Sequence, residues 1–363
     1  MTPAPTDQKN VTALLREYAL PSPLGFGQEL APIMYRADYM DGTWQAGQLT
    51  PFGEVNINPA ATCVQFGQQC FEGMKAYKVA HKKPTLFRPE ANYERFSRSA
   101  ARLGMPPPTP ELFADALSQL VTAFEAFIPG GSGQSLYLRP TLLGLDNTFA
   151  VKSSERFCFL LLASPSDVYY GDPIKIMIER THSRAAKGGT GAEKVGGNYA
   201  ASLLATKRCI EAGFDQPLWL DAATHSEVEE LSGMNFMAVI NDELHTPALS
   251  GTILPGVTRD SILCIAKSMG IRVVERTMPV ANLLTDIING SCSELFSCGT
   301  AAIVCPISEI GDVGGARMAL PETGKLAIKL RGALLDIQEG RADDPFDWTV
   351  PAEDTGSLLA RLG

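Results

Sequence analysis

A lysine inside a glycine-rich loop is the residue of this sequence best placed to do chemistry. Lys194 stands in Gly188-Gly-Thr-Gly-Ala-Glu-Lys-Val-Gly-Gly-Asn-Tyr199, and the chain continues into an amphipathic stretch that ends at Gly213. Glycines at this density let the backbone pack closely against a ligand. A lysine confined in such a loop can lose solvent and act as a nucleophilic amine. The alternative is a flexible surface loop with an ordinary solvated lysine.

Further residues downstream could complete a site around this amine. Tyr199 supplies a phenol shortly after the lysine, and Glu230 supplies a carboxylate just before an expected turn and strand. Pro255-Gly-Val-Thr258 opens an expected helix, whose first N–H groups could bind a phosphate. Cys298-Gly-Thr-Ala-Ala302 is a second glycine–threonine turn that could add N–H donors.

An amine, an acid, a phenol and a phosphate cradle are the parts that a pyridoxal phosphate site requires. Each part also has an ordinary explanation when taken alone. Glu230 could belong to a solvated acidic run, and Pro255-Gly256 could be a simple turn before a helix. The combination in this order favours the cofactor site.

The composition is that of a globular protein and argues against several classes of partner. With 363 residues, of which 45% are hydrophobic and 20% charged, the chain is long enough for two domains with their own cores. A net charge of −9 without any basic run argues against nucleic-acid binding. No apolar run reaches membrane-spanning length and the beginning lacks a signal-peptide core, so we expect a cytoplasmic protein that binds no membrane.

The eight cysteines and four histidines are scattered along the chain, and no C-x-x-C pair occurs. This spacing favours neither a disulfide framework nor a metal site. We therefore expect no bound metal, and we expect most of the cysteines to be small core residues.

Periodicity and turn residues predict grouped strands and helices in the first part of the chain. Residues 1–20 are expected to form a loose arm with one helical turn. The expected strands are 33–39, 63–66, 71–78, 136–140 and 157–163, and the expected helices are 91–103 and 110–127. Because these elements are grouped and do not strictly alternate, residues 1–165 are expected to form an α+β domain.

Residues 166–173 are rich in Pro, Gly, Asp and Ser, which is typical of an interdomain linker. A second domain would then span residues 174–363. Within it, Asn241-Asp242 is expected to be a hairpin turn between two strands. The other expected strands are 174–178, 218–221, 271–275, 294–297 and 303–307, and the expected helices are 200–213, 258–269, 280–289 and 322–340.

Several blocks together make the sequence specific. The second domain contains Glu193-Lys-Val-Gly-Gly-Asn-Tyr-Ala-Ala-Ser202, Glu230-x-x-x-x-Asn235-Phe236 and Leu254-Pro-Gly-Val-Thr-Arg259. The first contains Phe71-Glu-Gly-Met-Lys-Ala-Tyr77, Phe87-Arg-Pro-Glu-Ala-Asn-Tyr-Glu-Arg95 and Leu136-Tyr-Leu-Arg-Pro140. With these blocks the chain resembles the branched-chain amino acid aminotransferases, which are fold-type IV pyridoxal phosphate enzymes, from Leu24 to Trp348. The resemblance implies a two-domain α+β fold, with a smaller N-terminal domain and a larger C-terminal domain whose core is barrel-like.

The resemblance also implies how a cofactor would be held. Lys194 would bind pyridoxal 5'-phosphate covalently and then move a proton, while Glu230 would pair with the pyridine nitrogen. Tyr199 would hydrogen-bond the 3′-oxygen. The phosphate would be held by Arg95, Val257, Thr258 and Thr300.

The substrate side follows from the same resemblance. Tyr137 and the amides of Thr300 and Ala301 would take the α-carboxylate, and Arg139 would help to receive the distal carboxylate of glutamate. An apolar pocket would be walled by Phe26, Phe66, Phe71 and Tyr169.

Three positions depart from the family pattern. Phe66 stands where many members have a tyrosine, and Met237 replaces an aromatic residue. Ala302 lies opposite Cys305 where some animal members carry a redox pair, so we expect no thiol switch of that kind.

The expected activity is transfer of the amino group of L-leucine, L-isoleucine or L-valine to 2-oxoglutarate, in a homodimer acting on amino acids and 2-oxo acids. Two relatives on the same fold, a D-amino acid transaminase and an aminodeoxychorismate lyase, are the nearest alternatives. A non-catalytic binding protein on an inherited fold is the alternative from another class. Intact Lys194, Glu230, Tyr199 and Arg95 favour the enzyme.

Overall fold

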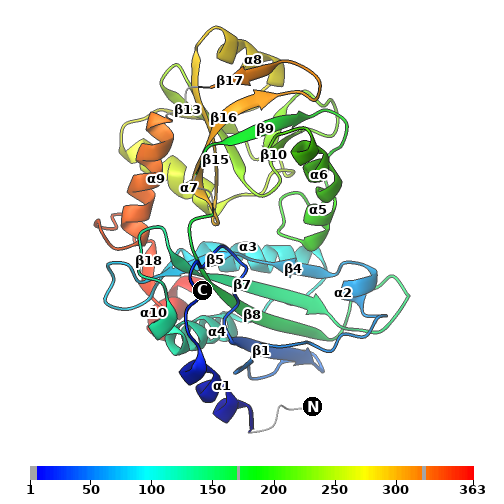
Figure 1. Ribbon diagram of the computed structural model, residues 1–363. Helices are drawn as coiled ribbons and strands as arrows, with labels where there is room; N and C mark the ends of the chain where they lie inside the picture. Colours follow the sequence, from blue (N-terminus) through cyan, green and yellow to red (C-terminus); the bar gives the residue numbers. More distant parts are fainter. Residues whose placement is uncertain (1–5, 170–171, 321–323) are drawn as a thin grey trace. The chain divides into compact units, whose positions relative to one another are not determined.

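The computed structural model describes residues 6–169, 172–320 and 324–363, and the chain divides into two compact units (Figure 1). Unit 1 comprises the residues up to 169, a short return at Lys194–Gly196, and Asp336–Gly363. Unit 2 comprises residues 170–193 and Gly197–Leu335. The division falls within the expected linker, of which residues 170 and 171 lie outside the described residues.

The last part of the chain, expected in the second domain, lies in unit 1. Strand β18 (Thr349–Pro351) pairs with β6 (Thr85–Phe87) of the first sheet. Helix α10 (Thr355–Leu362) packs against α3 (Pro89–Arg102) and α4 (Pro110–Ala123) and buries Leu358. These pairings link the end of the chain to unit 1.

Unit 1 is built on one mixed set of strands in the order β18-β6-β5-β7-β8-β1-β2, with β3 on β1 and β4 on β7. Its long central pair, β7 and β8, is antiparallel over its whole length. Helix α4 packs on β1 and β8, and a 3₁₀ turn, η1 (Glu125–Phe127), follows it. The remaining strands are β1 (Ile33–Met40), β2 (Thr43–Trp44), β3 (Gln48–Pro51), β4 (Gln69–Phe71), β5 (Met74–Tyr77), β7 (Ser135–Gly144) and β8 (Phe157–Ser166).

Two expectations for unit 1 are wrong. The arm contains a full helix, α1 (Thr6–Glu17), because Val11 and Leu15 lie one turn apart and pack on the core. The expected strand 63–66 is a single helical turn, α2 (Thr62–Gln65). There the amide of Phe66 donates to the carbonyl of Thr62 and folds the segment locally.

Unit 2 contains a closed ring of strands in the order β11-β10-β9-β16-β15-β12, which closes because β12 pairs back with β11. This ring confirms the expected barrel-like core. Strands β13 and β14 extend the sheet from β12, and β17 pairs with β16. The strands are β9 (Ile174–Glu179), β10 (Gln216–Leu220), β11 (Val228–Leu231), β12 (Asn235–Ile240), β13 (Glu243–Pro247), β14 (Val273–Arg276), β15 (Cys292–Gly299), β16 (Ile303–Gly311) and β17 (Arg317–Ala319).

The helices of unit 2 surround this barrel: α6 (Leu203–Glu211) packs on β10, while α7 (Val257–Ser268) and α8 (Val280–Ile288) pack on β15. The single helix expected over 200–213 is broken in two, because α5 (Gly196–Ala200) ends before α6 begins. Helix α9 (Lys325–Gln338) leads out of unit 2, and the expected start of this helix at residue 322 lies outside the described residues. The hairpin turn at Asn241-Asp242 is confirmed, with φ of 52° and 62°.

Six of the cysteines are buried, as expected for small core residues, and Cys63 and Cys264 are half-buried. Among the described residues, none of the helices combines the length and the apolar character needed to cross a bilayer.

Candidate active site

Lys194 is fixed to unit 1 by its own backbone. Its amide donates to Oγ of Ser99 at 2.9 Å, and its carbonyl accepts from the amide of Phe71 at 3.0 Å. The next residue, Val195, forms a β-bridge with Cys70. The Nζ atom of Lys194 lies 4.9 Å from the centroid of the Phe71 ring. The backbone that carries the amine is thus held by two elements, α3 and β4.

A buried ion pair lies beside this lysine. Arg95 of α3 donates from Nε to Oε1 of Glu72 at 2.6 Å, and a second nitrogen of its guanidinium donates to Oε2 at 2.8 Å. Glu72 is fully buried and also accepts from Asn92 and from the amide of Gly73. Burial opposes the charge of Glu72, but the charges of Arg95 and Lys194 and these donors hold its pKa below the usual value.

The expected substrate residues of unit 1 form a cluster of rings and one guanidinium. Arg139 donates to the hydroxyl of Tyr137 at 3.1 Å, and its guanidinium lies 4.9 Å from the Phe71 ring. Phe26 contacts the rings of Tyr137 and Tyr169, with centroids 5.1 and 4.7 Å apart. A side chain at Gly73 would collide with the Tyr137 hydroxyl, so the glycine lets that hydroxyl approach β5. Phe66 lies apart in the fold, at the C-terminal end of α2, and is 42% exposed.

Glu230 of β11 is a buried carboxylate with fixed partners in unit 2. It is 3% exposed, and its Oε1 pairs with a guanidinium nitrogen of Arg184 at 2.7 Å and accepts from the amide of Leu254 at 3.1 Å. Asn235 of β12 donates to Oε2 at 2.9 Å. A carboxylate placed in this way is a charged acceptor with a defined direction, not a member of a solvated acidic run.

Asn235 also fixes the start of α7 beside Glu230. Its amide donates to the carbonyl of Leu254 at 2.9 Å, and a side chain at Gly256 would collide with its Oδ1. Gly256 is the N-cap of α7, and no side chain caps this helix among the described residues. The N-terminus that begins with Val257 and Thr258 is thus placed near a buried carboxylate by one asparagine.

Strand register brings the second glycine–threonine turn to the same end of the barrel. Glu230 pairs with Asn235 across β11 and β12, and Asn235 pairs with Cys298 across β12 and β15. Thr300 and Ala301 follow in the turn after β15. Glu230, the start of α7 and this turn therefore belong to one region of unit 2.

Tyr199 lies on α5, and the glycine loop before it is fastened to this helix by Asn198. The amide of Asn198 donates to the carbonyls of Thr190 and Glu193 at 2.7 and 2.9 Å, and its Oδ1 accepts from the hydroxyl of Thr190. The loop is thus ordered by hydrogen bonds, which argues against the alternative of a flexible surface loop.

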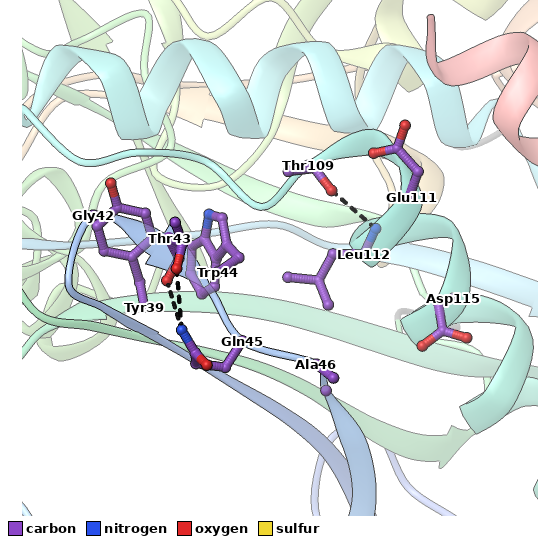
Figure 2. Close-up of a pocket in the computed structure, with 11 residues that line it drawn as sticks. Tyr39, Gly42, Thr43, Trp44, Gln45, Ala46, Thr109, Glu111, Leu112 and Asp115 are labelled. Atoms are coloured by element: carbon purple, nitrogen blue, oxygen red, sulfur yellow. Dashed lines mark hydrogen bonds between the residues drawn. The ribbon is translucent and has the colours of Figure 1, made fainter.

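A hollow of about 640 Å³ elsewhere on unit 1 contains none of these residues (Figure 2). It lies between the β1–β2 hairpin and the start of α4. Its polar groups have partners inside the fold: Thr109 caps α4 by accepting from Leu112, and Asp115 accepts from Tyr35 and Gln119. We assign it no chemistry.

Four residues of the site carried no assigned role in the sequence: Glu72, Arg184, Asn198 and Asn235. Three of them stand in blocks that the sequence made conspicuous, and a buried polar residue within such a block is the pattern that could have identified them. Arg184 precedes the glycine loop, and nothing in its spacing indicated a partner in β11.

The comparisons with known proteins agree with this site. Residues 69–310 match the family described as amino-transferase class IV. The branched-chain-amino-acid transaminase 1 of Bacillus subtilis (strain 168) is 39% identical over 350 residues, which covers 94% of this chain and 98% of the relative. The branched-chain-amino-acid aminotransferase of Mycolicibacterium smegmatis is also 39% identical and covers 93% of this chain and 94% of the relative.

Solved structures show the same fold. The branched-chain aminotransferase of Thermoproteus uzoniensis with norvaline has a TM-score of 0.72 at 25% identity and covers 87% of this chain and 99% of its own. A second branched-chain amino acid aminotransferase, from T.th., in complex with N-(5'-phosphopyridoxyl)-L-glutamate, has a TM-score of 0.69 at 27% identity and covers 87% and 98%. With a family match over most of the chain and relatives of this identity and coverage, the chain belongs to the class IV aminotransferases, in the branched-chain-amino-acid aminotransferase family.

Proposed function

We propose that this chain transfers the amino group of L-leucine, L-isoleucine or L-valine to 2-oxoglutarate, giving branched-chain 2-oxo acids and L-glutamate, with pyridoxal 5'-phosphate as its cofactor. Relatives at 39% identity carry the corresponding name, and one neighbouring structure holds a phosphopyridoxyl derivative of glutamate. The structural observation that carries the proposal is the buried Glu230 carboxylate, which Asn235 holds beside the uncapped N-terminus of α7.

The residues of unit 2 fit this cofactor. A protonated pyridine nitrogen needs a buried anionic acceptor, and Glu230 is one. A phosphate needs N–H donors that point at it, and the helix dipole at the start of α7 favours a negative charge. We assign Val257, Thr258 and Thr300 to the phosphate and Tyr199 to the 3′-oxygen.

The residues of unit 1 supply the amine and a cation. When bound, pyridoxal phosphate supplies an electron sink that makes a proton on the substrate's Cα acidic. Lys194 holds the cofactor through its amine and then moves the Cα proton, and its two backbone hydrogen bonds keep the base of the side chain in place. Arg95 has five N–H donors, of which two serve Glu72, so its guanidinium is oriented to add a contact to the phosphate.

Substrate recognition is assigned to the ring cluster of unit 1 and to one turn of unit 2. Phe26, Phe66, Phe71 and Tyr169 would contact an apolar side chain. Tyr137 and the amides of Thr300 and Ala301 would bind the α-carboxylate. Arg139 would accept the distal carboxylate of glutamate, because a guanidinium fork matches a carboxylate and avoids burying it unpaired.

A homodimer and a cytoplasmic location are also part of the proposal, and both rest on resemblance to the family. The mass of the purified protein by light scattering tests the first. A monomer at working concentration would remove the homodimer from the proposal without affecting the reaction.

The decisive experiment is an absorbance spectrum of the purified protein before and after L-leucine is added. We expect a visible band that L-leucine changes, and we expect Lys194→Ala to lose both the covalent link and transamination. A protein that stays colourless after pyridoxal phosphate is added would contradict the proposal. Transamination by the Lys194→Ala variant at the wild-type rate would remove the role of Lys194.

A further inference from the structure

Glu229 is a buried acid that the proposed reaction does not use. It stands next to Glu230 on β11, and because side chains alternate along a strand, the two carboxylates point to opposite faces. Glu229 is 5% exposed and borders a cavity of about 570 Å³ in unit 2. Burial raises its pKa, and the nearby hydroxyl of Thr252 and charge of Arg184 act in the other direction.

Glu229 is connected to Glu230 through two intermediate residues. Its Oε1 accepts from the hydroxyl of Thr252 at 2.5 Å. The carbonyl of the same Thr252 accepts from the guanidinium nitrogen of Arg184 that pairs with Glu230. Thr252 is 3% exposed, so its two ends link one carboxylate to the guanidinium that faces the other.

The contacts around this link leave little room for Arg184 to move. The same nitrogen of Arg184 also lies 3.3 Å from the carbonyl of Gly191. A side chain at Gly191 would collide with the Thr252 carbonyl, so the glycine loop packs directly on the Thr252 backbone. One NH₂ group has two hydrogens for three oxygens, so a shift of the Thr252 carbonyl changes the share that Glu230 receives.

We propose that Glu229 is a positioning residue that, through Thr252, holds Arg184 against Glu230 and thereby sets the charge that Glu230 presents to the cofactor's ring nitrogen. This inference rests on the proposed function, because it takes Glu230 as the partner of that nitrogen. Glu229 itself touches neither cofactor nor substrate in this scheme. Its effect on the reaction passes entirely through hydrogen bonds, and the geometry of those bonds is what the test must alter.

The test uses the enzyme reconstituted with pyridoxal phosphate labelled with ¹⁵N in the ring. The ¹⁵N chemical shift reports whether the ring nitrogen is protonated, independently of turnover. Thr252→Val removes the hydroxyl at nearly constant size, and Glu229→Ala removes the acceptor. For both we expect a moved ¹⁵N shift and a kcat lower by about tenfold to a hundredfold, the loss typical for partners behind a site's direct ligands. KM should change little.

Glu229→Gln separates positioning from charge. A glutamine keeps an oxygen that accepts from Thr252, so this variant should resemble wild type. Glu227→Gln is the matched control, because Glu227 borders the same cavity and has no hydrogen bond to Thr252 among the described residues. It should leave the ¹⁵N shift and kcat unchanged.

The outcomes distinguish this inference from the proposed function. If Glu230→Gln leaves the ¹⁵N shift unmoved, the assignment of Glu230 fails, and the inference fails with it. If Glu230→Gln moves the shift while Thr252→Val does not, only the inference is overturned. A Glu229→Gln variant as impaired as Glu229→Ala would also overturn it, because the charge and not the hydrogen bond would then matter. Thr252→Val and Glu229→Gln keep the side-chain volume, so the result does not depend on Glu229→Ala folding.

Discussion

Arg139 contacts both a phenol and a ring, which makes two roles for it separable by mutation. Its hydrogen bond to Tyr137 indicates a brace, and its place above Phe71 indicates a cation beside the proposed substrate side chain. A charge-assisted hydrogen bond contributes about 1.5–3 kcal/mol. We predict that Arg139→Met raises KM for glutamate and 2-oxoglutarate by roughly tenfold to a hundredfold, and KM for leucine and its keto acid much less. Steady-state kinetics with both substrate pairs measures this.

Tyr137→Phe is the control for the brace. It removes the hydrogen bond from Arg139 but keeps the guanidinium and the ring contact with Phe26. If Arg139 acts only as a brace, both variants should impair the two substrate pairs alike. Equal losses for leucine and glutamate in Arg139→Met would therefore discard the dual recognition.

The ion pair of Glu72 and Arg95 predicts a dependence of stability on pH. Because the pKa of Glu72 is lowered in the folded protein, its carboxylate stabilises the fold above the unfolded pKa of about 4.3. That contribution is lost as the pH falls through the folded pKa. Removing one partner of a buried pair costs about 3–5 kcal/mol. We predict that Glu72→Gln lowers the free energy of unfolding by about this amount at pH 7.

The gap between wild type and Glu72→Gln should then narrow below about pH 4.3, since wild type loses the contribution that the variant lacks. Urea unfolding at a series of pH values, down to the lowest at which both proteins are folded, measures the gap. A gap that stays constant with pH would mean that the charge of Glu72 contributes nothing.

At the scale of elements, the start of α7 depends on a glycine for steric reasons alone. Gly256 has φ of −70°, which any residue adopts, but a side chain there would collide with Oδ1 of Asn235. We predict that Gly256→Ala displaces Asn235, costs about 1–3 kcal/mol of stability and weakens the affinity for pyridoxal phosphate. Fluorescence titration of the apoenzyme with the cofactor measures that affinity.

Gly233→Ala is the matched control in the turn before β12. It is exposed, and a side chain there meets no atom within 4 Å. Its cofactor affinity should equal that of wild type. If both alanine variants bind the cofactor as wild type does, the proposed coupling between Asn235 and the helix start is wrong.

Local chemistry explains which elements the sequence predicts well. The Asn241-Asp242 turn is predicted because both residues tolerate positive φ, and α7 because Pro255-Gly256 precedes an apolar period. Strand β11 was not predicted as a strand, since Val228–Leu231 is short and half acidic and forms through pairing with β10 and β12. Closure of the barrel depends on that long-range pairing, and the expectation of a barrel-like core came from the resemblance.

The candidate site shows the same division. Lys194 and Glu230 are conspicuous because their residue types and neighbours suit a cofactor. Arg184 and Glu72 act through partners on other elements, and side-chain pairing between elements leaves no periodic trace in the sequence. Conversely, Cys63–Phe66 has strand-like residues, but local hydrogen bonds close it into a turn.

At the scale of the molecule, each unit has an apolar core of its own. The core of unit 1 includes residues from both ends of the chain, among them Val11, Val350 and Leu358. The core of unit 2 lies inside and around the barrel, with Phe236 and Leu295 among its members. A change at the end of the chain should therefore loosen unit 1 selectively.

Leu358 on α10 tests this division, because it is fully buried in the core of unit 1. We predict that Leu358→Ala costs about 2–5 kcal/mol, the range for emptying a buried leucine site. Hydrogen exchange should become faster in α3 and α4, against which α10 packs, and stay unchanged in β12 and β15 of the barrel. Ala360→Ser, at an exposed position of the same helix, should leave every rate unchanged. Equal acceleration in both units would show that the chain opens as one cooperative body, and the assignment of residues 336–363 to unit 1 would then have no energetic meaning.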